Sequence, residues 1–395
     1  DYSTEVPYFT KLANKLPFVD TDVPSNLSVR ADMAYLIPGT PSGIDVTGAA
    51  STYIDDFEAS QIPISILSPL DWYEASTPKY FPGINGEKDD LTYNDFRAKM
   101  AWYSVDQIFY GVGETPSNIN ADELSRAETR QINYNELFPN VQLDITQNSL
   151  IRTLDLAYFP AERGSYNFDT GNTVNTDGTF SDPQKRWAGV MRPLTTNNFD
   201  QANVEYIQFW VMDPYENYSI TNAEGLPQGI NPADPSNQVG DLYINLGNVS
   251  EDILKDSRKM YENGLPEDGN QVDGVNVNKT NFSNVPTNPS IIYAFNEDDT
   301  SRLNQDLGFD GVINTSEKDK LTEIATKLGI TVNFNKLNPN DIASDNFQFF
   351  RGEQLDAQDA SIITRYKNYN NTEDNSPTLN QSTESYPTSS TSYPD

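Results

Sequence analysis

The chain has 395 residues, enough for two or three domains, and it carries 58 Asp and Glu against 26 Lys and Arg. The resulting formal net charge of −32 repels phosphate backbones, so we expect no nucleic-acid partner. The chain contains no histidine and no cysteine, which excludes Ser-His-Asp and Cys-His catalysis, disulfides and conventional zinc or iron sites. We therefore expect a protein that is not an enzyme.

The sequence pattern of residues 1–40 predicts a short helix followed by an outer-membrane barrel strand. The stretch Tyr8–Leu16 places apolar side chains on one helical face. From Asn26 to Ile37, apolar and mostly polar side chains alternate, as in a transmembrane β-strand that faces lipid on one side. A half-buried strand of a soluble sheet alternates in the same way, so that alternative stays open. No secretory signal opens the chain, and because the sequence begins abruptly at Asp1, we expect it to be a fragment of a longer protein.

Residues 50–290 predict a mainly β fold, a jelly-roll-like β-sandwich with long loops and a few short helices, inserted after the barrel strand. The run Val204–Met212 is apolar on both faces and predicts a central strand. Leu242–Leu246 alternates and predicts another strand, whereas Asp95–Trp102 predicts a short helix. Barrels have short periplasmic turns and long outer loops, so the insertion should lie on the extracellular face.

Two further segments complete the predicted organisation. Residues 291–370 predict an acidic extension of loops and short helices, with one helix over Lys318–Leu328 that Gly329 ends. Residues 371–395 are rich in Asn, Ser, Thr and Pro and predict a flexible polar linker.

An acidic stretch from Asp306 to Glu317 follows the spacing of a twelve-residue calcium loop. The expected ligands are four side chains and one carbonyl oxygen, from Asp306, Asp310, Asn314, Glu317 and Val312 respectively. Gly308 occupies the third position, where such loops carry a ligand, so an acidic turn that caps the following helix is the alternative. The sequence thus predicts structural calcium as the one cofactor.

A weaker acidic pair lies in the short predicted strand Tyr53–Glu58. Asp56 and Glu58 share a strand face and are weaker candidates for metal ligands. Two nearby carboxylates can also act as acid and base in glycoside cleavage, but nothing in the sequence marks their partners. A structural role or a loosely bound cation is therefore the favoured interpretation.

Aromatic and basic side chains offer two further alternatives. A group of aromatic residues predicts either a platform that stacks on sugars or a hydrophobic core, and the core is favoured: Trp72, Tyr73, Trp187, Tyr206 and Trp210. Three arginines in this acidic chain are expected to pair with carboxylates rather than bind a ligand: Arg163, Arg186 and Arg192.

The central part resembles the jelly-roll modules that bind carbohydrates. Tyr53–Glu58 is similar to their opening strand, and Val204–Val211 is similar to the core strand that carries a Trp. This resemblance implies a structural calcium near the first strand.

A more extensive resemblance is to the SprA family (Sov in some members). These are the giant outer-membrane translocons of the type IX secretion system of the Bacteroidota, tied to gliding motility. The stretches that carry it cover most of the chain: Lys15–Asn26, Ala34–Gly39, Tyr53–Glu58, Arg186–Arg192, Gly240–Asp252 and Arg365–Asn371.

The SprA resemblance implies the location and partners of the chain. It implies an outer-membrane protein at the cell surface whose inserted sandwich caps a protein-conducting barrel. The implied partners are the remainder of the barrel chain, a smaller PorV-like barrel, a plug protein, secreted cargo and outer-membrane lipid along residues 26–37. A carbohydrate- or cargo-binding module at the cell surface is the alternative function.

Overall fold

The computed structural model divides the chain into two compact units, Asp1–Pro63 with Asn198–Glu205 and Ile64–Asn197 with Tyr206–Asp395. The structure describes the following residues: 2–18, 20–29, 64–78, 81, 92–144, 149–167, 169, 173–194, 198–199, 204, 206–212, 240–247, 249–250, 252–254, 265–280, 284–287, 304–305 and 312–369. In the described residues, no helix is both long and apolar enough to cross a membrane.

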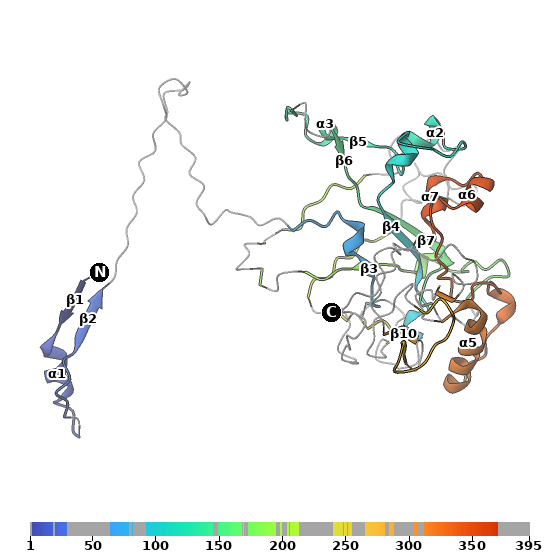
Figure 1. Ribbon diagram of the computed structural model, residues 1–395. Coiled ribbons are helices and arrows are strands. Elements are labelled where there is room, and N and C mark those ends of the chain that lie inside the picture. The colour runs from blue at the N-terminus through green and yellow to red at the C-terminus, as the bar shows by residue number, and fades with distance from the viewer. Residues whose placement is uncertain are drawn as a thin grey trace. The chain divides into compact units, whose positions relative to one another are not determined.

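The first unit is built on a two-stranded antiparallel sheet with a helix in its connection. Strand β1 (Tyr2–Glu5) pairs with β2 (Asn26–Val29), and helix α1 (Pro7–Ala13) lies between them in the chain (Figure 1). Proline at the start of α1 suits a helix because its missing N–H would have no partner there. No residue of α1 is buried. Strand β2 begins at the residue where the sequence predicts one, and the remainder of that predicted strand lies outside the described residues.

The second unit contains short strands, each paired antiparallel with one other: β3 (Tyr73–Glu74) with β8 (Val190–Met191), β4 (Ala98–Tyr103) with β7 (Asp155–Arg163), β5 (Ile132–Asn133) with β6 (Leu150–Ile151), and β9 (Val277–Lys279) with β10 (Asn284–Pro286). Its α-helices are α2 (Ala121–Leu124), α3 (Tyr134–Leu137), α5 (Asn314–Leu328), α6 (Glu353–Ala357) and α7 (Ile362–Tyr366). Among the described residues of this unit, 3₁₀ helices span Pro69–Asp71, Thr92–Asn94, Gln107–Tyr110, Pro183–Lys185 and Phe334–Lys336.

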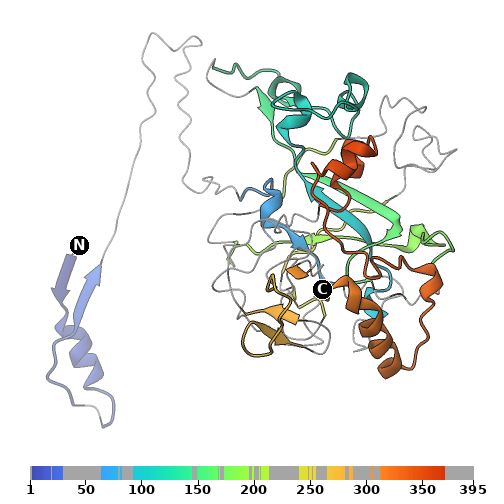
Figure 2. The same ribbon diagram turned by 45° about the vertical axis from the view of Figure 1, so that its right-hand side comes forward.

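The β4–β7 ribbon is the longest paired element of the second unit (Figures 1 and 2). Ala101 pairs with Ala157, and the register shifts by a bulge between Ala98 and Lys99. Gly164 comes directly after β7. Only glycine fits there, because a Cβ atom at this position would lie 2.3 Å from the carbonyl oxygen of Ala98. The bulge thus brings the end of β7 close to the start of β4.

The two largest hydrophobic clusters of the described residues both include residues of this ribbon. One joins Tyr103 and Phe109 to Phe350, Ile362 and Tyr366 from the C-terminal part of the chain. The other has members in six segments of the unit: Tyr93, Trp102, Tyr166, Ile253, Leu254, Val285 and Ile324. The core is therefore assembled from segments far apart in the sequence.

The structure corrects three local predictions. The predicted helix over Asp95–Trp102 is wrong, because residues 98–103 form strand β4, whose pairing with β7 overrides local helix preference. Residues 206–212 belong to no strand and expose their apolar side chains, so the predicted central strand is wrong over these residues. Residues 242–246, predicted as a strand, are likewise exposed and unassigned. A buried strand needs hydrogen-bonded neighbours on both sides, and no described segment supplies them here.

The wider predictions fare differently. The helix predicted over Lys318–Leu328 is confirmed as the main part of α5, which ends at Gly329 in the left-handed conformation, φ 68°. The jelly-roll architecture and the boundaries of the four predicted segments stay predictions. The predicted linker over 371–395 lies outside the described residues.

Candidate metal centre

The residues of the predicted calcium loop fall partly within the described chain. Asp306 and Asp310 lie outside it, as do Asp56 and Glu58 of the weaker pair. Val312 is buried just before α5, and Asn314 is the first residue of that helix. Glu317, in the first turn of α5, is buried with 3% of its surface exposed. The calcium-loop ligation over residues 306–317 stays a prediction.

Glu317 faces a loop that the sequence did not connect with it. The backbone N–H groups of Ile342 and Ala343 donate hydrogen bonds to its Oε2 atom, at 2.7 and 3.1 Å. Its other carboxylate oxygen, Oε1, is buried and has no hydrogen-bond partner among the residues that the structure describes. The carboxylate is thus fixed through one oxygen, and the other is left without compensation for its lost water.

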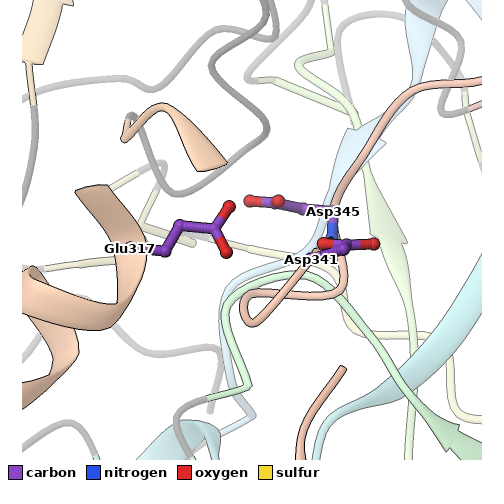
Figure 3. A group of neighbouring side chains, drawn as sticks. All are labelled: Glu317, Asp341 and Asp345. Atoms are coloured by element: carbon purple, nitrogen blue, oxygen red, sulfur yellow. Dashed lines mark hydrogen bonds between the residues drawn. The ribbon is translucent and has the colours of Figure 1, made fainter. Parts of the chain in front are cut away.

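Two aspartates of the same loop complete an acidic cluster, defined here as Glu317, Asp341 and Asp345. One carboxylate oxygen of each residue lies within 4.8 Å of the others. Figure 3 shows the Glu317 carboxylate reaching from α5 toward the two aspartates. The N–H of Asp345 donates to Oδ1 of Asp341 at 3.0 Å, which holds the loop closed on itself. Asp345 is fully buried.

Burial and like charge act together on Glu317. Burial raises the pKa of the Glu317 carboxyl to about 7, and the neighbouring Asp341 adds to this rise. Hydrogen bonds from the backbone of Ala343 and Ile342, and the positive charge of Arg163, act in the opposite direction. Desolvation is therefore the dominant influence on the pKa of this carboxyl.

Two basic side chains lie against the loop. The Arg163 guanidinium, at the end of β7, donates to the carbonyl oxygens of Ile342 and Asn167 at 2.5 and 2.6 Å. Burial lowers the pKa of Arg163, and the surrounding acids, Asp169 first, oppose that change. Lys99 Nζ donates to the carbonyl oxygen of Ser344 at 3.2 Å. Both side chains therefore make these hydrogen bonds to the backbone, while the carboxylates converge on one another.

The other predicted arginines pair with acids as expected. Arg186 forms an ion pair with Asp182 and packs over the ring of Phe180. Arg192 lies 3.5 Å from Asp71. Arg163 differs because its hydrogen bonds go to carbonyl groups.

The predicted aromatic group divides between core and surface. Trp187 is buried beneath the guanidinium of Arg97, 4.5 Å from its ring centroid, and Trp72 packs at the edge of the core. Tyr206 and Trp210 are 71% and 69% exposed. The core interpretation therefore holds for Trp187 and Trp72 and fails for Tyr206 and Trp210.

Sequence reasoning found Glu317 but missed Asp341 and Asp345. The acidic spacing before α5 pointed to Glu317, whereas the two aspartates come from the stretch 338–346, beyond the helix. Their proximity is created when the chain turns back through the 3₁₀ helix Phe334–Lys336. The concentration of Asn and Asp in that stretch was the available signal.

The comparisons with known proteins point to the same C-terminal region. No curated protein matches the chain. Residues 320–395 match the family SprA_N, described as a motility related/secretion protein. The match includes α6, α7 and the two aspartates of the acidic cluster. The resemblance to SprA proteins is confirmed there, because this C-terminal part of the chain is similar to the SprA_N family of motility-related and secretion proteins.

Proposed function

We propose that the chain is part of the protein-conducting translocon of a type IX secretion system in the outer membrane. In this proposal the second unit is a non-catalytic extracellular cap over the barrel pore. The observation that carries it is the SprA_N match over residues 320–395, together with the way this segment is built into the second unit.

The family segment and the β4–β7 ribbon share one core. The ring of Tyr366 stacks on that of Tyr103, with 4.0 Å between centroids, and Phe350 packs beside both Phe109 and Tyr366. The N–H of Asp106 donates to Oη of Tyr366 at 2.9 Å. A secretion role of the family segment therefore involves the whole packed unit, because the segment cannot leave it without opening this core.

The first unit supports the barrel part of the proposal. Strands β1 and β2 pair antiparallel around a short helix, as neighbouring barrel strands do around a turn. Tyr8, Phe9 and Leu12 on α1 are exposed, and so is Leu27 on β2. Lipid and the remainder of the barrel chain are the proposed partners that cover this apolar surface.

The size of the proposed pore is the reason to expect a cap over it. A barrel wide enough for folded cargo would leak solutes unless protein covers its outer mouth. The proposed partners at that barrel are a smaller PorV-like barrel, a periplasmic plug protein and the secreted cargo, as in the SprA family that the sequence resembles. A packed unit on the outer face would close the pore while cargo leaves sideways.

A second candidate function rests on the exposed aromatic side chains. Tyr206, Trp210 and Tyr243 are each about 70% exposed, and Trp210 contacts Phe138 edge-on. Exposed aromatics of this kind stack on sugar rings and on cargo side chains. This observation favours recognition of a glycan or of cargo at the cell surface.

The test replaces residues 64–369 of the parent protein by a short flexible linker. Cargo on the cell surface and entry of a large antibiotic are then measured in the same cells. The control retains these residues and carries the same linker inserted within residues 371–395. Both variants are first shown to reach the outer membrane at the level of the unmodified protein.

A leaky membrane with continued secretion supports the cap. A tight membrane with arrested secretion overturns it in favour of recognition, and unchanged secretion with unchanged permeability contradicts both. The double variant Tyr206→Ala, Trp210→Ala tests recognition separately, because these side chains contribute little to the core. A loss of cargo binding by that variant would favour the second candidate.

A further inference from the structure

We propose that the acidic cluster binds one divalent calcium ion, which fastens the start of α5 to the loop 338–346. The ligands are carboxylate oxygens of Glu317, Asp341 and Asp345. The site is distinct from the loop predicted from the sequence, since it shares only Glu317 with it. The inference rests on the geometry of the cluster and does not require the proposed function.

The first argument is the unpartnered oxygen of Glu317. Oε1 is buried and makes no hydrogen bond within the described part of the chain, although Oε2 of the same carboxylate accepts two. A buried acceptor left without a partner is costly, and a bound cation supplies the missing interaction. The carboxylate points toward the two aspartates, so a cation between the three groups would meet this oxygen (Figure 3).

The second argument is the spacing of the oxygens. Calcium binds oxygen ligands at about 2.3–2.6 Å, so two ligands of one ion lie at most about 5 Å apart. The three carboxylate oxygens lie within 4.8 Å of one another, which satisfies that limit. Asn346, next to Asp345 in the chain, also has a buried side-chain oxygen that no described residue meets with a hydrogen bond.

The chemistry of the ligands selects the ion. The chain has no histidine or cysteine, the ligands that zinc and soft metals prefer. Carboxylates suit hard cations, and calcium tolerates an irregular set of oxygens, whereas magnesium demands near-octahedral geometry at about 2.0–2.1 Å. Arg163 does not replace the ion, because its guanidinium makes its hydrogen bonds to the carbonyl oxygens of Ile342 and Asn167.

The ion would connect a residue outside the segment that matches the family with two residues inside it. Glu317 lies just before the matched segment 320–395, and the two aspartates lie within it. The loop that carries the aspartates also accepts hydrogen bonds from Arg163 of β7 and from Lys99 of β4. Calcium binding should therefore stabilise the contact of the family segment with the β4–β7 ribbon.

The test measures calcium binding by the full 395-residue chain after removal of metal with a chelator. Equilibrium dialysis with radioactive calcium gives stoichiometry and affinity, and thermal unfolding is followed with and without calcium. Three isosteric variants remove single charges from the cluster: Glu317→Gln, Asp341→Asn and Asp345→Asn. The matched control is Asp319→Asn, an exposed carboxylate on the same helix.

We expect one calcium per chain at this site with a dissociation constant of about 10⁻⁴ to 10⁻³ M, the range of extracellular modules. Each cluster variant should weaken binding at least about tenfold and abolish the calcium-induced rise in the unfolding temperature. The control should bind as the unmodified chain does. Circular dichroism of each variant in chelator establishes that it is folded.

Asp306→Asn and Asp310→Asn distinguish the two calcium hypotheses. Loss of binding in these two variants, with normal binding by Asp341→Asn and Asp345→Asn, would overturn the proposal and place calcium in the loop 306–317. Absence of binding by the unmodified chain at millimolar calcium would also overturn it. Neither result bears on the cap, which is tested by secretion and leakage.

Discussion

Arg97 and Glu74 form an ion pair that is almost completely buried, with Nη1 of the arginine 3.3 Å from Oε1 of the glutamate. Arg97 also donates to the carbonyl oxygen of Ala75 at 2.7 Å. Burial raises the pKa of Glu74 to about 7, even though the positive charges of Arg97 and Lys99 act to lower it. The desolvation of the carboxylate is therefore the larger effect at this site.

The raised pKa of Glu74 predicts the sign of a pH effect. Between about pH 4.5 and pH 7 the folded chain keeps the proton that the unfolded chain releases. The contribution of this group to stability is therefore full at low pH and is lost as the pH rises toward 7. In Glu74→Gln this loss should disappear, which chemical unfolding at pH 5 and pH 7.5 can measure as a smaller difference in the free energy of unfolding. An unchanged difference in the variant would contradict the prediction.

Arg365 shows how one buried side chain fixes the family segment. It is fully buried and donates to the carbonyl oxygens of Ala360 and Phe350 and to the side-chain oxygen of Asn118. Its Nη1 atom also lies 2.8 Å from Oδ1 of Asp356. The side chain thus ties α7 to both α6 and the early part of the second unit.

Replacing Arg365 by Met keeps much of its volume and removes these hydrogen bonds. We expect the free energy of unfolding to fall by about 3 kcal/mol, because several buried oxygens lose their donor at once. Arg351→Met, at an exposed position of the same segment, should change it by less than about 0.5 kcal/mol. Urea unfolding of both variants checks this. Equal effects of the two substitutions would show that the buried hydrogen bonds of Arg365 do not stabilise the fold.

At the scale of elements, the sequence predicted the helix that a local residue pattern determines. It missed the strand that forms only by pairing with a distant segment. Helix α5 was predictable because its pattern is continuous and Gly329 ends it in the left-handed conformation. Strand β4 was not, since residues 98–103 become a strand only by pairing with β7. The cluster aspartates follow the same rule, because their distance to Glu317 depends on how the loop 338–346 returns to α5.

The bulge between β4 and β7 predicts a strong effect of one added methyl group. A Cβ atom at Gly164 would lie 2.3 Å from the carbonyl oxygen of Ala98, so Gly164→Ala must push the strands apart. We expect a loss of about 2–3 kcal/mol in the free energy of unfolding. At Gly189 the new atom would make an ordinary contact, 3.5 Å from Cβ of Ala75, so Gly189→Ala should cost less than about 1 kcal/mol. Thermal unfolding of the two variants should rank them in this order.

At the scale of the molecule, the C-terminal part completes the core of the second unit. A chain that ends at residue 341 lacks Phe350, Ile362 and Tyr366 and leaves Tyr103 and Phe109 uncovered. We expect this truncated chain to be cleaved rapidly by a protease under conditions in which the full chain resists. A chain that ends at residue 370 keeps the whole cluster and should resist like the full chain. Equal resistance of the two truncated chains would contradict this reading of the core.

The hydrogen bond between Asp106 and Tyr366 cannot form until late in the synthesis of the chain. It joins residues 260 positions apart, and its neighbours in the same cluster are similarly distant. A ribosome adds about 5–20 residues per second, so roughly 13–50 s separate the synthesis of the two halves of this contact. Throughout that interval the apolar face around Tyr103 has no covering helix. We expect this face to be open to chaperones during synthesis, and the cluster can pack fully only after α7 has been made.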